Sequence, residues 1–132
     1  MKLTYKKMLD AEKHLGMLIQ LKPAPTARLA SQIARNARLV GQTLQDFYAA
    51  REGLLAPHKD AEGKFNEAAM PEGEHGVLIA EYTELLETEV DVDVHPLSIA
   101  EIESVEERKP GFEIPGEVYF IIDWMFVDES QD

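Results

Sequence analysis

Hydrophobic residues repeat at helical spacing in two segments of the N-terminal half. Across residues 5–21 and 27–55 they recur every three or four positions, which predicts two amphipathic helices. Thr4 and Thr26 stand directly before these segments, where a side-chain oxygen can cap the first N–H groups. Prolines in 22–25 separate the segments, so a long antiparallel helical hairpin is predicted over residues 5–55. The apolar stripe of the second helix comprises Leu29, Ile33, Ala37, Val40, Leu44, Phe47 and Leu54.

The pattern changes inside the segment 77–97, which reads VLIAEYTELLETEVDVDVHPL. Leu78, Tyr82 and Leu85 share one helical face, with Val77 and Ile79 beside it, which predicts a third helix. From residue 89 to residue 94 acids and valines alternate with a period of two. This alternation predicts a strand with one buried and one solvent-exposed face.

Shorter elements follow toward the C-terminus. Ser98 and Glu101 have the spacing of a capping box, which predicts a short helix over 99–105. The alternating segment 112–114 is expected to pair with the strand. Pro115 and Glu117 favour a helix over 116–127, although the β-forming residues of this segment favour a strand as the alternative.

These elements predict an α+β protein that is mainly helical. The long antiparallel helical hairpin would be joined by the third helix and by a small two- or three-stranded sheet. We expect one domain over 1–132, divided into the hairpin 5–55, a loop 56–76 and a helix–strand–helix part 77–127. The loop contains several glycines and prolines, so it is expected to be mobile, with one helical turn near 65–70.

Composition narrows the classes of function. The chain has 132 residues and no cysteine, which excludes disulfides, thiolate metal sites and cysteine nucleophiles and fits a reducing cytoplasm. It contains no apolar run of about 18 residues, so no membrane span is expected. Charges interrupt the first residues where a secretion signal needs an apolar segment, so we expect no secretion.

Charge is distributed unevenly along the chain. The net charge is −12, but residues 1–59 hold ten basic and four acidic residues, a net charge of +6. Residues 60–132 hold three basic and 21 acidic residues, a net charge of −18. Two interpretations are open: the halves lie against each other and partly neutralise, or the acidic half faces a basic partner.

Acidic residues of the third helix, the strand and the following helix form the predicted partner-binding surface. Clustered carboxylates can mimic a row of phosphates and occupy a basic groove, and the alternative is an ordinary solvated surface. The candidates are Glu81, Glu84, Glu87, Glu89, Asp91, Asp93, Glu101 and Glu103.

A metal site is the weakest of the chemical hypotheses. Asp91, Asp93 and His95 would project from one strand face about 7 Å apart, where they could hold a divalent cation or transfer protons. The alternative is the charged outer face of an edge strand. The sequence contains no glycine-rich phosphate loop, GxSxG elbow or HExxH motif. We therefore expect no catalytic residue and no cofactor.

Parts of the chain resemble a loose family of small proteins from tailed-bacteriophage genomes. The resemblance lies in the MKL start, in EYTELLETEVDVDVHPLSIAEIE over residues 81–103 and in the apolar end over 118–129. The connector 22–25 and the alanine-rich second helix depart from the pattern. The resemblance supplies no catalytic residue, and it implies a virus-encoded protein in the host bacterial cytoplasm.

The sequence and the resemblance together lead to three functional hypotheses. The first is a non-enzymatic phage accessory protein that binds a basic host or viral protein, for instance to inhibit a host nucleic-acid-handling or anti-phage defence system. The second is a virion structural or assembly factor that forms a homo-oligomer through helical faces. The least favoured is a metal-dependent hydrolase. Because the chain is acidic overall, we expect neither direct nucleic-acid binding nor membrane association.

Overall fold

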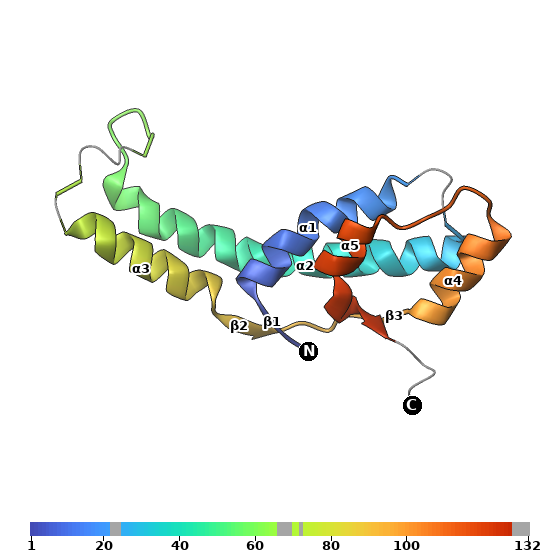
Figure 1. Ribbon diagram of the computed structural model, residues 1–132. Coiled ribbons are helices and arrows are strands. Elements are labelled where there is room, and N and C mark those ends of the chain that lie inside the picture. The colour runs from blue at the N-terminus through green and yellow to red at the C-terminus, as the bar shows by residue number, and fades with distance from the viewer. Residues whose placement is uncertain (22–24, 66–69, 72, 128–132) are drawn as a thin grey trace.

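A computed structural model describes residues 1–21, 25–65, 70–71 and 73–127 (Figure 1). It confirms the predicted class, a mainly helical α+β protein with a long helical pair and a small sheet. The elements, in chain order, are β1 (Lys2–Thr4), α1 (Tyr5–Ile19), α2 (Ala27–Leu55), the 3-10 helix η1 (Ala56–His58), α3 (Glu74–Leu86), β2 (Glu89–Asp91), β3 (Leu97–Ser98), α4 (Ile99–Arg108), α5 (Gly116–Ile121), the 3-10 helix η3 (Asp123–Met125) and β4 (Phe126–Val127).

Helix α2 is the axis along which the other helices are arranged. Helix α1 runs antiparallel to its first part, and α3 runs antiparallel to its last part (Figure 1). The ring of Phe47 lies where these two neighbours meet, 5.4 Å from Tyr5 of α1 and 6.2 Å from Tyr82 of α3, measured between centroids. The predicted hairpin is therefore one of two hairpins that share α2.

The N-terminal ends of the predicted helices follow from their capping residues. The hydroxyl groups of Thr4, Thr26 and Ser98 each accept a hydrogen bond from the backbone N–H three residues later, at 3.1, 3.3 and 3.2 Å. The bounds of α2 are those predicted. Helix α3 begins earlier than expected, at Glu74. The preceding residue, Gly73, has a φ of 97°, which a glycine adopts without strain.

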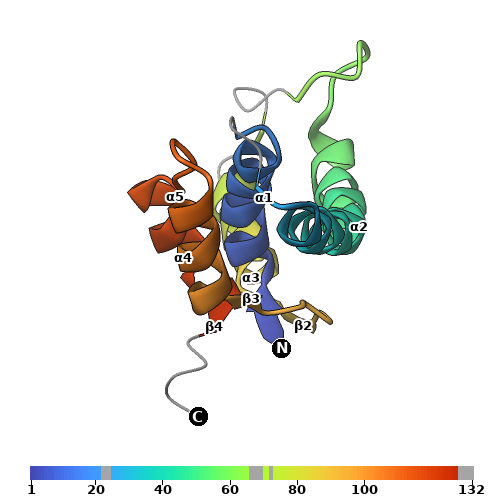
Figure 2. The same cartoon turned by 90° about the vertical axis from the view of Figure 1, so that its right-hand side faces the viewer.

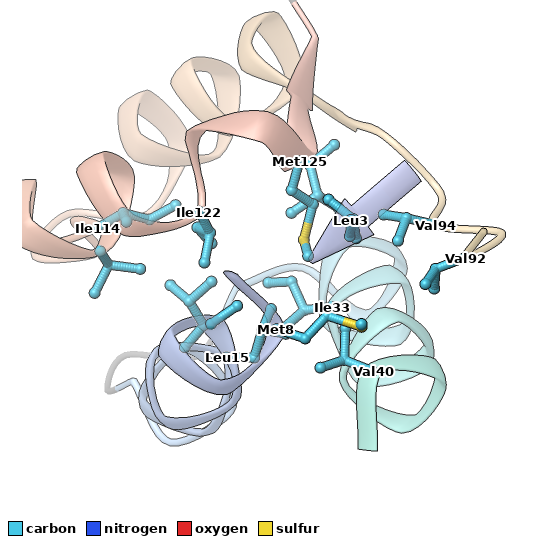
Figure 3. Close-up of a cluster of buried hydrophobic side chains, with 14 of the residues drawn as sticks. Leu3, Met8, Leu15, Ile33, Val40, Val92, Val94, Ile114, Ile122 and Met125 are labelled. Atoms are coloured by element: carbon cyan, nitrogen blue, oxygen red, sulfur yellow. The ribbon is translucent and has the colours of Figure 1, made fainter. Parts of the chain in front are cut away.

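The hydrophobic core lies between α1, the first part of α2 and the C-terminal elements. Viewed end-on, α1 lies between α2 and α5 (Figure 2). Side chains from segments far apart in sequence meet there (Figure 3). The labelled members of this cluster are Leu3, Met8, Leu15, Ile33, Val40, Val92, Val94, Ile114, Ile122 and Met125. Leu78 of α3 is also buried but lies outside the cluster.

The predicted strand has a different partner from the one expected. Strand β2 pairs antiparallel with β1 at the start of the chain, with Leu3 opposite Val90. The segment 112–114 forms no strand, so its predicted pairing is wrong. Its alternation nevertheless reports burial correctly, because Phe112 and Ile114 are in the core and Glu113 is exposed. Packing against the core, rather than strand pairing, accounts for this pattern.

The alternation of acids and valines also continues beyond the end of β2, where it reflects burial and not a strand. The strand ends at Asp91, yet Val92 and Val94 remain buried while Asp93 remains exposed. The extended chain then reaches β3, which pairs in parallel with β4.

The C-terminal segment contains both of the structures that the sequence favoured. Residues 116–121 form α5, and after η3 the chain enters β4. The helical turn expected near 65–70 falls largely on residues outside the described ranges.

No helix in the described ranges combines the length and the apolar character needed to cross a membrane. Helix α2 has the length, but charged side chains recur along it.

Candidate functional site

The predicted acidic residues fall into three groups rather than one surface. Every one of them is exposed except Glu101, which is half-buried. Helices α3 and α4 lie at opposite ends of the molecule (Figure 1). The groups are Glu81 and Glu84 on α3 with Glu87 directly after it; Glu89, Asp91 and Asp93 on β2 and just after it; and Glu101 and Glu103 on α4.

The spacing along α2 separates the α4 group from the α3 group. Glu101 forms an ion pair with Arg28 at the start of α2, with 3.6 Å between Nε of Arg28 and Oε1 of Glu101. Glu81 lies in a hollow with Leu54 near the end of α2. The helical rise between Arg28 and Leu54 is about 40 Å. One compact partner surface therefore includes the α3 group or the α4 group, but not both.

The β2 group faces a basic residue of β1. Lys2 lies directly opposite Asp91 in the antiparallel pair. The flanking residues Met1 and Val92 exchange backbone hydrogen bonds of 3.4 and 2.9 Å. Lys2 and Asp91 thus form a non-hydrogen-bonded pair of the ladder, a position at which opposite charges favour strand pairing.

The weak metal candidates do not form a metal site. Asp91 and Asp93 are exposed, whereas the His95 backbone is held against α2 by the buried side chain of Asn36. The His95 ring nitrogen Nε2 is buried. Within the described residues, no group of three or more His, Asp or Glu side chains is placed to hold a metal ion. The trio that the strand pattern suggested is therefore not assembled as a ligand set.

The last part of α2, together with η1 and α3, extends beyond α1 as a pair of helices (Figure 1). We call residues 50–58 and 73–88 the α2–α3 arm. Leu54 and Leu78 lie between its two helices, and a groove runs along each side of this contact.

One side of the arm carries carboxylates. Two hollows of about 710 and 420 Å³ share Leu54 and Glu81, and together we call them the acidic groove. Its lining comprises Ala50, Gly53, Leu54, Pro57, His58, Gly73, Glu74, Val77, Leu78, Glu81, Glu84, Leu85 and Thr88.

The other side of the arm is mainly hydrophobic. A hollow of about 320 Å³, which we call the apolar groove, is lined by Arg51, Leu54, Leu55, Phe65, His75, Leu78, Ile79 and Tyr82. The Arg51 guanidinium lies 5.0 Å from the centroid of the Tyr48 ring, within the range of a cation–π contact. The two grooves therefore differ in both charge and polarity.

Two hydrophobic residues of α3 are more exposed than the sequence pattern indicated. Val77 is 59% exposed beside the acidic groove, and Ile79 is 52% exposed beside the apolar groove. They were expected to flank the buried face, but α3 contacts α2 through a narrower stripe centred on Leu78. Each groove consequently has an exposed hydrophobic residue at its edge.

Among the residues that the structure describes, no ion pair neutralises the carboxylates of the acidic groove. The ion pairs in the described ranges are Arg28–Glu101 and Lys59–Glu52. Neither includes Glu81 or Glu84, and both of these are exposed. The interpretation that the basic and acidic halves neutralise each other therefore does not account for the charge of α3.

The side chain of Tyr48 joins α1 to α2 close to the arm. Its hydroxyl donates a hydrogen bond of 3.1 Å to Oε1 of Glu12. Burial, and then the hydrogen bond to this carboxylate, raise the pKa of Tyr48 above its ordinary value. Tyr48 therefore remains a hydrogen-bond donor at neutral pH and holds the two helices together.

In comparisons with protein-family models, curated proteins and solved structures, nothing matches this chain. The functional argument accordingly rests on the geometry and charge of the arm.

Proposed function

We propose that this protein is a non-enzymatic accessory protein that binds a basic protein partner through the α2–α3 arm. The observation that carries the proposal is the acidic groove, where Glu81 and Glu84 have no ion-pair partner among the described residues and Val77 is exposed beside them. Hydrophobic surface supplies affinity on binding, and complementary charge supplies orientation and a fast encounter.

The resemblance to tailed-bacteriophage proteins suggests the biological setting of this binding. In that setting the protein acts in the host bacterial cytoplasm on a host or viral protein. A surface of closely spaced carboxylates can occupy the basic groove of a protein that handles nucleic acid. Inhibition of such a host system, including a defence system, is the activity that we propose.

Charge reversal on α3 tests this proposal. We expect the protein to capture a basic partner from bacterial lysate at low salt, and the complex to weaken at high salt because the contacts are partly electrostatic. Replacing Glu81 and Glu84 with lysine should then lower the affinity for the captured protein about tenfold or more. Pull-down with mass spectrometry, followed by titration of the purified partner, measures both effects.

The matched control reverses two exposed charges at the other end of the molecule. Glu103 and Glu107 of α4 are exposed, and their replacement by lysine changes the net charge by the same amount. This control should retain the affinity. Equal loss in both variants would show that net charge, and not the arm, determines binding.

The apolar groove favours a second candidate function, self-association as an assembly factor. Ile79 and Phe65, at its edge, are 52% and 40% exposed. This candidate predicts an oligomer that persists at high salt, because burial of apolar surface is not screened by ions. Ile79→Glu should convert the oligomer to a monomer in sedimentation velocity. Ala80→Glu, on an exposed position outside both grooves, should leave it intact.

A further inference from the structure

We propose that the acidic groove is the docking site for a basic amphipathic helix of the partner. This inference rests on the proposed function and names the kind of segment that the arm binds. Three properties of the groove support it: its length, the shape of its floor and the placement of its charges.

The length of the groove corresponds to a short helix. Along α3 the lining runs from Gly73 to Thr88. At the rise of an α-helix this stretch is about 22 Å long, which matches a partner helix of about 15 residues, or four turns. Helices of this length commonly bind by placing an apolar stripe in a hydrophobic groove.

The floor of the groove has room for large side chains. Leu54 and Leu85 provide apolar surface, while α2 contributes the small residues Ala50 and Gly53. A Cβ atom built on Gly53 would have no atom within 4 Å, so the space above it is open. A leucine side chain of a docked helix can therefore lie against α2 at this exposed position, beside Leu54.

The arrangement of the arm leaves this position open to a third helix. Along the arm, α2 and α3 lie as a pair (Figure 1). A docked helix would bury Val77 and complete a three-helix arrangement, which buries more apolar surface than a helical pair can.

The charges of the groove select a basic helix. Glu81 and Glu84 are three residues apart, so they lie on the same side of α3, and Glu74 extends this side toward its N-terminal end. A helix with lysine or arginine beside its apolar stripe would place cations against them. An acidic helix or a nucleic-acid backbone would be repelled.

The probe for the experiment is a synthetic peptide of about 15 residues, with leucines at spacings of three and four and lysines beside them. The control peptide has the same composition, with the leucines distributed around the helix. We expect the patterned peptide to bind the full-length protein about tenfold more tightly than the control, as measured by calorimetry.

Gly53→Met is the blocking variant. Its side chain would occupy the open space in the groove, and methionine favours a helix over glycine, so the variant should remain folded. We expect it to lower the affinity for the patterned peptide about tenfold. Gly53→Ala, which adds a single methyl group, should retain most of the affinity.

Single charge reversals distinguish the failure of this inference from the failure of the proposed function. Glu81 lines the groove, whereas Glu87 is exposed directly after α3 and does not line it. If Gly53→Met and Glu81→Lys lose affinity for the patterned peptide while Glu87→Lys retains it, the helix-docking site is supported. If Glu81→Lys and Glu87→Lys lose affinity for the peptide equally and Gly53→Met has no effect, the docking site is overturned. Binding through the acidic charge of this region would then still stand. No loss in any variant overturns both.

Discussion

Replacing Phe47 with alanine is expected to lower the free energy of unfolding by about 3–5 kcal/mol. The side chain is fully buried, and its ring lies 5.4, 5.7 and 6.2 Å from the rings of Tyr5, Tyr48 and Tyr82. Alanine would remove these contacts and leave a cavity where α1, α2 and α3 meet. Both the hydrophobic core and the attachment of the arm depend on this residue.

Chemical denaturation monitored by circular dichroism measures the predicted loss. Phe65→Ala is the control, because Phe65 is 40% exposed and its removal should cost less than about 1 kcal/mol. Amide hydrogen exchange should also show faster opening of α3 in Phe47→Ala, since Tyr82 loses its neighbour. A loss of less than about 1 kcal/mol in Phe47→Ala would contradict the assigned position of the ring.

The helices could be predicted from the sequence because their signals are local. Thr4, Thr26 and Ser98 each satisfy an N–H group only three residues away, so the residue type and its neighbours suffice. The apolar spacing of α2 likewise depends on the helical period alone. Predicting these helices therefore does not require knowing which segments of the chain pack against each other.

The strand pairs could not be predicted in this way. Strand β1 has three residues, β3 and β4 have two each, and segments this short contain no measurable period. Their partners lie far along the chain, so the pairing depends on how the helices pack first. Burial explains why 112–114 looked like a strand, because any extended segment beside a core alternates in this way.

The candidate site was only partly accessible to sequence reasoning. Seven of the eight acidic candidates are exposed and Glu101 is half-buried, but they do not form one surface. Glu84 is on α3 and Glu101 is on α4, and these two helices lie at opposite ends of the molecule. The grooves were not foreseen, because they depend on α3 pairing with the last part of α2.

Asn36 is the core residue that the predicted stripe missed. It lies three residues after Ile33 and four before Val40, so it is in phase with the buried face, while Ala37 is only partly buried. A polar residue in phase with an apolar stripe is expected to have a specific hydrogen-bond partner. In this protein the partner is the backbone of His95.

Replacing Asn36 with leucine is expected to lower the free energy of unfolding by about 2–4 kcal/mol. Nδ2 of Asn36 donates to the His95 carbonyl oxygen at 2.7 Å, and the His95 N–H donates to Oδ1 at 2.9 Å. Leucine has a similar volume but leaves both backbone groups without a partner in a partly buried position. Thermal or chemical unfolding measures the loss. Gln42→Leu, at an exposed position of the same helix, should change stability by less than about 0.5 kcal/mol.

Asn36→Asp provides a pH-dependent test of the same pairing. An ionised carboxylate can accept from the His95 N–H but cannot donate to the carbonyl oxygen, whereas the protonated form can do both. Burial and this hydrogen bond should raise the pKa of the introduced carboxyl in the folded state above its unfolded value of about 3.9.

Because the folded-state pKa is raised, the stabilising contribution of the protonated form is complete below the unfolded pKa. It is lost as pH rises through the folded pKa. Asn36→Asp should therefore be much less stable than the unmodified protein at about pH 7 and should approach it toward about pH 4. The deficit of Asn36→Leu should remain constant over this range, since leucine does not titrate. A constant deficit in Asn36→Asp would mean that the side chain does not donate to His95, and the extended segment after β2 would then be held to α2 by the packing of its valines alone.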